Sequence, residues 1–226
     1  RLILWAAGAL SCAAFGEEAS AINATANLDR QFQTIESFTA SDAWSGNFIG
    51  KFFADDKKEK LAKWLFSQKY GEDGSPEGIG LSMWRINIGG GTWEQEGADI
   101  FPIQRRAESF LTKDGKNYDW SKAAGQQWFM KKAKELGCES FLLFSNTPPV
   151  QMTQNSKGYK DAADFKSNLR PDMYDDFAEY MATVAKHFVD EGYNIDYISP
   201  VNEPGWRWST NAQEGSPWLN PELKRL

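Results

Sequence analysis

Short apolar runs alternate with amphipathic segments along most of the chain. The apolar runs, which are typical of strands, lie near residues 32–38, 81–88, 141–144 and 195–201. The amphipathic segments predict helices over residues 56–67, 120–136 and 171–191, and Asp119 is well placed to cap the second of them. Strands that alternate with helices in this way predict an α/β fold with a parallel sheet.

The lengths of the connections indicate how this sheet is built. Loops after the strands are long and turns before them are short, which is typical of a (β/α)8 TIM barrel with its active site at the C-terminal ends of the strands. The 226 residues hold four strand–helix units. We therefore expect the N-terminal half of such a barrel, truncated after about the fourth strand. The alternative, a doubly wound sheet, is disfavoured because no glycine-rich phosphate-binding turn follows the first strand.

The start of the chain differs in composition from the rest. Residues 1–16 contain an arginine, then a short apolar run and small residues, so we expect a secretory signal peptide rather than a buried strand or helix. Residues 17–30 are expected to form a linker, and residues 31–226 the partial barrel. The protein would then be secreted, extracellular or periplasmic, with Cys12 as a candidate for lipid attachment.

Composition narrows the classes of partner. Aromatic residues make up 14% of the chain, which fits either a sugar-binding surface or a large aromatic core. The net charge of −6 and the lack of a basic patch argue against nucleic acid. No apolar run is long enough to span a bilayer. With one histidine and two cysteines, neither a metal site nor a Ser-His-Asp triad is expected, and we expect no cofactor.

The tripeptide Asn202-Glu203-Pro204 follows the fourth predicted strand, at the catalytic edge of the expected barrel. Retaining glycosidases pair an acid/base carboxyl group with a nucleophilic carboxylate about 5–5.5 Å away. We interpret Glu203 as the general acid/base and Asn202 as a hydrogen-bond partner of the sugar 2-hydroxyl. Trp206 and Trp208 are candidates for a stacking surface at the next sugar. The alternative is a capped strand end without catalytic function.

Four more residues follow or lie on the predicted strands. Arg85 is expected to keep the nucleophile ionised and oriented, or else to form a structural ion pair. Asp42 would bind sugar hydroxyls with Trp44 against the ring, although a turn aspartate and a core tryptophan are the alternative. Asn146 follows the third strand and would face the same site, or be an ordinary polar loop residue.

At these residues the sequence resembles glycoside hydrolase family 30, and within it the endo-β-1,6-galactanase branch. The resemblance is carried by residues 37–50, 78–95, 144–155 and 199–206. It implies a (β/α)8 barrel beside a β-sandwich. As an alternative to a linker, residues 17–30 would then be the start of a strand of this β-sandwich. It also implies retaining hydrolysis by two glutamates, with Glu203 as the acid/base and the nucleophile on a seventh strand outside this chain.

Site residues also follow from the resemblance. Asp42, Trp44, Arg85 and Asn146 match positions that line the subsite of the reacting sugar, and Asn202 matches the asparagine before the acid/base. Asn146 stands where the glucosylceramidase branch has tryptophan, which argues against a pocket of that kind.

The hypotheses differ in substrate and in class. The first is an endo-acting hydrolase of β-1,6-linked galactan or a similar plant or microbial polysaccharide. A β-1,6-glucanase, a xylanase or an exo-glycosidase of the same family is the second. A catalytically inactive barrel that only binds polysaccharide is the third.

Overall fold

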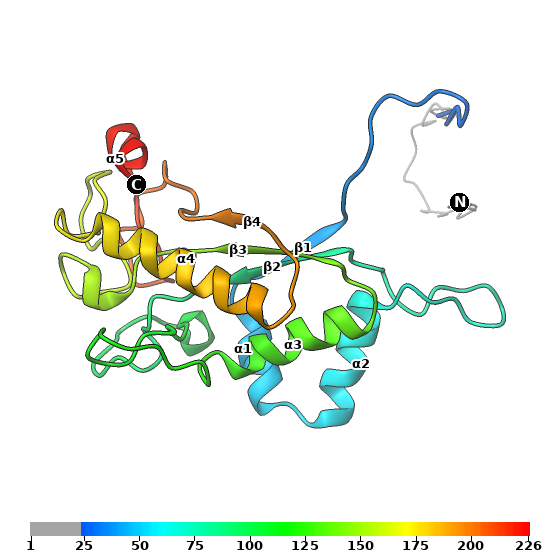
Figure 1. Ribbon diagram of the computed structural model, residues 1–226, viewed down its shortest axis with the longest axis horizontal. Helices are drawn as coiled ribbons and strands as arrows, with labels where there is room; N and C mark the ends of the chain where they lie inside the picture. Colours follow the sequence, from blue (N-terminus) through cyan, green and yellow to red (C-terminus); the bar gives the residue numbers. More distant parts are fainter. Residues whose placement is uncertain (1–23) are drawn as a thin grey trace, which may run out of the picture. The chain divides into compact units, whose positions relative to one another are not determined.

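The computed structural model describes residues 24–226 (Figure 1). It divides the chain into two units at residues 35 and 36. In the first unit, the described residues 24–35 form neither helix nor strand. The predicted signal peptide and Cys12 lie outside the described residues. The second unit, residues 36–226, contains the sheet and the helices and is described below.

Four parallel strands form one sheet in the order β1-β2-β3-β4, which confirms the predicted α/β fold with a parallel sheet (Figure 1). The strands are β1 (Thr39–Asp42), β2 (Met83–Asn87), β3 (Ser140–Phe144) and β4 (Ile195–Ser199). The prediction of the first strand was wrong, because residues 32–38 form no strand. Phe32 and Phe38 are 80% and 59% exposed, and it is the polar segment after them that pairs with β2.

Three helices confirm the predicted amphipathic segments: α2 (Asp55–Phe66), α3 (Ala124–Glu135) and α4 (Tyr174–Asp190). Helix α3 begins later than predicted. Asp119 does not cap it, since its carboxylate accepts the Ser121 N–H at 3.0 Å instead. Helix α4 ends before Gly192, whose φ of 83° suits glycine. A short C-terminal helix, α5 (Asn220–Arg225), follows β4.

Helix α1 (Ser45–Phe52) was not predicted, because it is short and the face that it buries consists of Gly46, Asn47 and Gly50 rather than apolar side chains. It packs closely on α3, where Gly50 and Gly125 leave room for the two backbones. Glu108, in the loop after β2, accepts hydrogen bonds from Asn47 at 2.8 Å and Lys51 at 3.1 Å. Tertiary contacts therefore stabilise a helix that its own sequence favours weakly.

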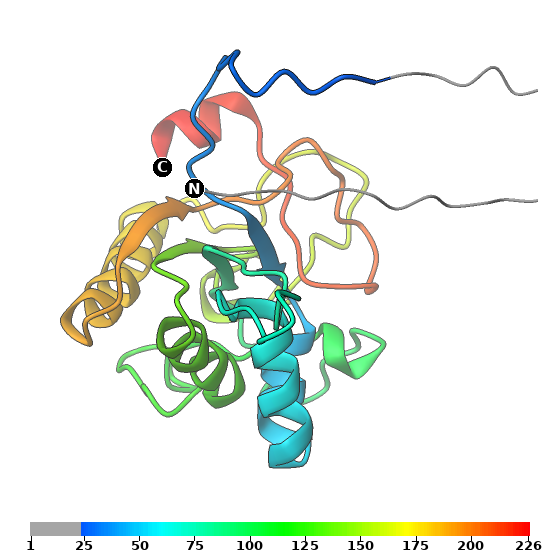
Figure 2. The same ribbon diagram turned by 90° about the vertical axis from the view of Figure 1, so that its right-hand side faces the viewer.

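The hydrophobic core lies between the sheet and helices α2, α3 and α4, which curve around one face of the sheet (Figure 2). Trp84 of β2 meets Phe66 of α2 edge-on, with ring centroids 4.9 Å apart. Since side chains alternate along a strand, Arg85 and Asn87 point to the opposite face of the sheet. The core thus fixes β2 so that its polar side chains face away from the helices.

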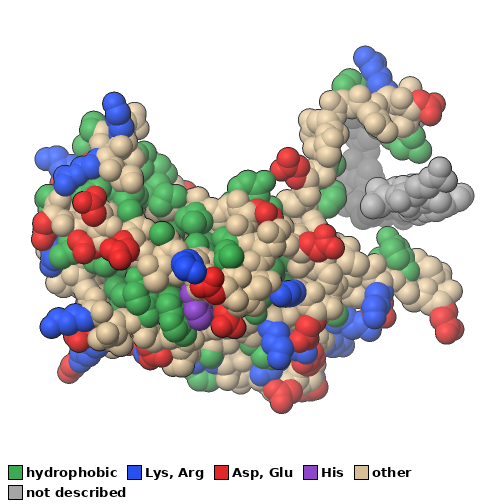
Figure 3. Space-filling view, viewed as in Figure 1, with side chains coloured by type: hydrophobic (Ala, Val, Ile, Leu, Met, Phe, Trp, Pro, Cys, Tyr) green, Lys and Arg blue, Asp and Glu red, His purple; other side chains and the backbone are tan. Residues whose placement is uncertain are grey.

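Charged side chains of both signs are interspersed over the face shown in Figure 3. His187, the only histidine, is half-buried on α4 and stacks on Trp120 with ring centroids 3.8 Å apart. Among the helices of residues 24–226, none combines the length and the hydropathy needed to cross a membrane.

Candidate active site

The parallel register places the C-terminal ends of the four strands along one edge of the sheet. Asp42 pairs with Ile86, Asn87 pairs with Phe144, and Phe144 pairs with Ser199. The loops that leave this edge carry most of the residues that the sequence predicted for the site. The edge of the sheet is therefore where the candidate active site is built.

Arg85 is the centre of the polar contacts on the face of the sheet opposite the helices. It donates to Asn202 Oδ1 at 2.7 Å and to Ser41 Oγ at 2.9 Å. Its guanidinium carbon lies 3.3 Å from the centroid of the Phe144 ring. Burial lowers the pKa of Arg85, and the nearby negative charge of Glu203 opposes this shift. Arg85, Asn202 and Glu203 are thus brought together, whereas the predicted contact of Arg85 with the nucleophile stays a prediction.

Glu203 itself has an unusual backbone and an open side chain. Its φ is 45°, in the left-handed region that residues with a Cβ rarely adopt. Its carbonyl oxygen accepts hydrogen bonds from the Trp206 N–H at 3.0 Å and from Trp208 Nε1 at 3.1 Å. The side chain is exposed and lines an open hollow of about 500 Å³. The carboxyl group is therefore accessible to a large substrate.

The two tryptophans after Glu203 lie in different surroundings. Trp206 is 66% exposed and lines the same hollow as Glu203. Trp208 is only 6% exposed, and its ring packs against Gly215. Trp206 is thus free to stack on a sugar, whereas the predicted stacking role of Trp208 is not supported by its buried position.

Asp42 and Trp44 are not on the same face as Arg85. Asp42 is 3% exposed and shares a small cavity with Trp84, Leu61 and other residues of the helix layer. Its Oδ1 accepts the Gly46 N–H at 2.8 Å, which anchors the start of α1. Burial raises the pKa of Asp42 to about 7, and the Gly46 hydrogen bond partly opposes this. Trp44 is half-buried, with the Arg105 guanidinium 5.4 Å from its ring centroid.

Two buried amides lie at the ends of β2 and β3. Asn87 Nδ2 donates to the Ala43 carbonyl at 3.2 Å, and Asn87 Oδ1 has no partner among the described residues. Asn146 is 3% exposed, and its Nδ2 likewise has no partner in residues 24–226. The Asn146 carbonyl accepts the Ser216 N–H at 3.0 Å. Both side chains retain hydrogen-bonding capacity at the C-terminal ends of the strands.

Glu214 is a buried carboxyl group that the sequence analysis missed. It is fully buried in the loop after β4 and accepts hydrogen bonds from residues of the loop after β2. Burial raises its pKa to about 7, against the effect of these hydrogen bonds. Its sequence neighbours are polar and small, so no local pattern distinguishes it from a surface glutamate.

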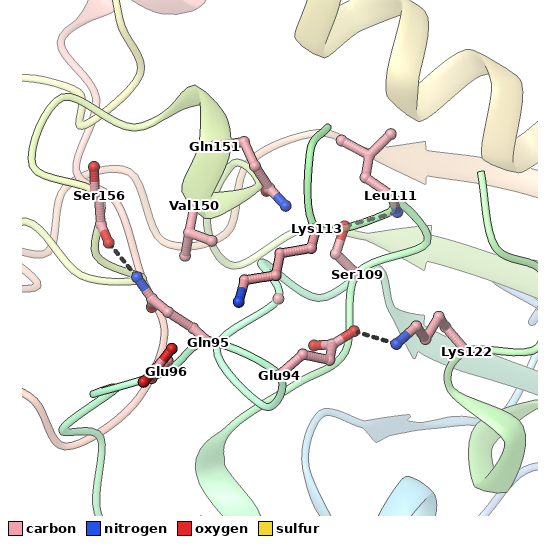
Figure 4. Close-up of a pocket in the computed structure, with 11 residues that line it drawn as sticks. Glu94, Gln95, Glu96, Ser109, Leu111, Lys113, Lys122, Val150, Gln151 and Ser156 are labelled. Atoms are coloured by element: carbon pink, nitrogen blue, oxygen red, sulfur yellow. Dashed lines mark hydrogen bonds and ion pairs between the residues drawn. The ribbon is translucent and has the colours of Figure 1, made fainter. Parts of the chain in front are cut away.

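A second hollow of about 340 Å³ lies between the loops after β2 and β3 (Figure 4). Glu94 and Lys122 form an ion pair of 3.4 Å along its wall, and the Gln95 amide donates to the Ser156 carbonyl. Burial raises the pKa of Glu94. None of the predicted site residues lines this hollow. Within residues 24–226, no three His, Cys, Asp or Glu side chains gather as metal ligands would.

Comparison with protein families identifies the family of the chain. The sequence model of O-glycosyl hydrolase family 30 matches residues 21–226, which is most of the chain. The chain belongs to O-glycosyl hydrolase family 30. Its four-stranded parallel sheet is similar to catalytic domains of this family, including that of xylanase C from Talaromyces cellulolyticus. For that domain the TM-score is 0.54 and the identity 21%, over 83% of this chain and 40% of the other.

Two curated relatives and one further structure are also similar to this family 30 chain. The exo-β-1,6-galactobiohydrolase of Bifidobacterium longum subsp. longum is 25% identical over 86% of this chain and 16% of its own. The endo-β-1,6-galactanase of Hypocrea rufa is 25% identical over 91% of this chain and 45% of its own. A conserved exported protein from Bacteroides fragilis has a TM-score of 0.83 and 42% identity, over 88% of this chain and 40% of that one. The chain thus spans less than half the length of each.

Proposed function

We propose that Glu203 is the general acid/base of a retaining glycoside hydrolase. The observation that carries this proposal is the hydrogen bond between Arg85 and Asn202, which fixes the residue before Glu203 at the catalytic edge of a family 30 sheet. Family membership and the accessibility of Glu203 in an open hollow support the same function. Hydrolysis needs no metal ion or organic cofactor, since two carboxyl groups can carry out both steps.

In the proposed first step, a carboxylate from another part of the barrel attacks the anomeric carbon. The glycosidic C–O bond breaks while Glu203 gives its proton to the leaving oxygen. In the second step Glu203 removes a proton from water, whose oxygen attacks the same carbon and releases the nucleophile. The two steps restore the proton on Glu203 and retain the configuration of the sugar.

Arg85 and Asn202 would orient the reacting sugar. Because Asn202 Oδ1 accepts from Arg85, its Nδ2 is left to donate outward. We infer that this amide binds the sugar 2-hydroxyl, where the hydrogen bond strengthens as the ring approaches an oxocarbenium ion. Trp206 would stack on the neighbouring sugar. Three further residues stay candidates for the subsite of the reacting sugar: Asn146, Asp42 and Trp44. Asp42 and Trp44 would approach this subsite from the helix side of the sheet.

We further propose that the sheet is the N-terminal half of a (β/α)8 barrel. The strands follow chain order without a reversal, as successive barrel strands do and doubly wound strands do not. The share of each relative that the chain covers supports the same view. The nucleophile would then come from a later strand, and the protein would carry a β-sandwich and an export signal.

The proposed substrate is a β-1,6-linked galactan, cleaved within the chain. This rests on the two curated relatives, whose names describe endo-β-1,6-galactanase and exo-β-1,6-galactobiohydrolase activities. Exo-action on the same linkage is the second candidate. Activity on β-1,6-glucan or xylan, and binding of polysaccharide by an inactive barrel, are less well supported by these two relatives.

The decisive experiment is Glu203→Gln in the protein that contains the complete barrel. Turnover of β-1,6-galactan should fall by about 10²–10⁴-fold, because the proton donor is lost, while binding of the polysaccharide is kept. Glu72→Gln, at an exposed position before β2, is the matched control and should leave turnover unchanged. Product analysis on β-1,6-galactan and β-1,6-glucan identifies the sugar. Retention of full activity by Glu203→Gln would refute the acid/base assignment.

A further inference from the structure

The buried carboxylate of Glu214 joins two loops at the catalytic edge. Its oxygens accept hydrogen bonds from the backbone N–H groups of Gly90 at 3.0 Å, Thr92 at 3.3 Å and Ala107 at 3.4 Å. The Thr92 hydroxyl donates a fourth. Every donor comes from the loop after β2, whereas Glu214 belongs to the segment after β4. A fully buried carboxyl group is costly without such partners, so these bonds fix the position of Glu214.

The fixed position of Glu214 restrains Trp208 through Gly215, the residue that follows Glu214. Gly215 lies so close to the Trp208 ring that an added Cβ would be 2.2 Å from two of its atoms. The Gly215 N–H donates to the Gly158 carbonyl at 2.8 Å, and the Trp208 carbonyl accepts the Lys160 N–H at 2.9 Å. Trp208 is therefore held on both sides and has little freedom to move.

Trp208 in turn contacts the backbone of Glu203. Its Nε1–H donates to the Glu203 carbonyl at 3.1 Å. Glu203 has a left-handed φ of 45°, and Trp208 itself has a φ of 51°. Non-glycine residues keep such conformations only where their surroundings hold them. The indole hydrogen bond and the buried anchor behind it supply such a restraint.

We propose that Glu214 is a positioning residue, which acts through Gly215 and Trp208 to hold the Glu203 backbone in the conformation that aims its carboxyl group at the leaving oxygen. This inference rests on the proposed acid/base role of Glu203. It adds that the loop after β2, although it lies two strands away in the sheet, controls proton transfer by Glu203.

Trp208→Phe tests the link to Glu203 directly, because phenylalanine keeps most of the buried ring and removes the indole N–H. Turnover of the polysaccharide should fall about tenfold with little change in KM, since a misplaced acid slows bond cleavage more than binding. A dinitrophenyl glycoside of the same sugar needs no proton on its leaving group. Its burst of phenolate release should stay within about twofold of the wild-type rate.

Thr92 provides a matched pair for the link to Glu214. Thr92→Val keeps the shape and removes the hydroxyl, whereas Thr92→Ser keeps the hydroxyl. Thr92→Val should show the same selective loss on the polysaccharide, about three- to tenfold, and Thr92→Ser should restore most of the activity. Glu214→Gln should show a larger loss of the same kind. Thermal unfolding of each variant checks that it is folded.

The outcomes separate this inference from the acid/base proposal. A loss of equal size on the polysaccharide and the dinitrophenyl glycoside would overturn the positioning role, since general damage affects both substrates. Unchanged turnover by folded Trp208→Phe would overturn it as well. If either of these results is obtained while Glu203→Gln is inactive, the acid/base role of Glu203 is kept and only the positioning role of Glu214 is lost. If Glu203→Gln keeps full activity, the acid/base role itself fails.

Discussion

At the scale of single residues, Asp42 shows what burial does to a carboxyl group at the C-terminal end of a strand. It lies on the helix side of the sheet, among Trp84 and the residues of α1 and α2. Burial raises its pKa from 3.8 to about 7. In the unfolded chain the group ionises at the lower pH, so between these values the folded state holds a proton that the unfolded state has lost. The contribution of Asp42 to stability therefore falls as the pH rises through this range and is level above it.

Asp42→Asn should remove this pH dependence, because an amide keeps an acceptor for the Gly46 N–H and does not ionise. The unfolding free energy of the variant, relative to wild type, should increase by roughly 2–4 kcal/mol between about pH 4 and about pH 8. Denaturant titrations of both proteins at several pH values measure this difference. A difference that stays constant with pH would contradict the raised pKa.

Residue identity alone predicted part of the candidate site. Asn202-Glu203-Pro204 is recognisable because an amide and a carboxyl group stand in consecutive residues directly after an apolar run. Arg85 was expected to orient the nucleophile, which stays a prediction. Its observed contacts with Asn202, Ser41 and the Phe144 ring come from three other parts of the chain, and the charge of Glu203 lies nearby. Glu214 was missed because all its donors lie more than 100 residues away in sequence. A carboxyl group whose burial depends on such distant loops leaves no local pattern.

At the scale of elements, the contact between α1 and α3 depends on the absence of two side chains. A Cβ on Gly125 would lie 2.0 Å from the Asn47 carbonyl oxygen, and a Cβ on Gly50 would lie 2.4 Å from the Gly125 carbonyl oxygen. The Gly125 N–H also donates to Asn47 Oδ1 at 3.0 Å. The two backbones are thus in direct contact, with no flexible side chain that could move aside.

Gly125→Ala should therefore destabilise the protein, although alanine is the better helix former. We expect a loss of about 1–3 kcal/mol, because the clash is with backbone and forces α1 away from α3. Gly205→Ala is the control, since nothing lies within 4 Å of its added Cβ. Denaturation midpoints of the two variants compare the sites. A Gly125→Ala variant as stable as wild type would show that the helices can separate at no cost.

The sequence could predict those elements whose apolar pattern lies within the segment itself. Helices α2, α3 and α4 carry apolar stripes, and β2, β3 and β4 are apolar runs between polar loops. Helix α1 is short and buries Gly46, Asn47 and Gly50 rather than apolar side chains, and β1 is the polar segment Thr39–Asp42. These two elements are stabilised by pairing with β2 and by contacts with Glu108 and α3. Patterns within the segments themselves therefore could not reveal them.

At the scale of the whole molecule, the sheet of residues 36–226 has two outermost strands, β1 and β4, each with one unpaired side among the described residues. Strand β1 pairs only with β2, and β4 pairs only with β3, among the described residues. Apolar side chains near these edges are open to solvent, with Tyr197 and Ile198 both 45% exposed and Phe38 59% exposed. Unpaired edges with exposed apolar side chains favour pairing with other chains. In the proposed barrel, later strands would cover both edges.

Residues 36–226 expressed alone should therefore associate and lack hydrolytic activity. Association follows from the open edges of β1 and β4, and inactivity follows from the proposed location of the nucleophile on a later strand. Light scattering and a reducing-sugar assay on β-1,6-galactan measure the two properties. Ile198→Lys should reduce the association without restoring activity, because a charge on the edge strand opposes pairing but supplies no nucleophile. Robust hydrolysis by this segment would place both catalytic carboxyl groups within it and refute the half-barrel proposal.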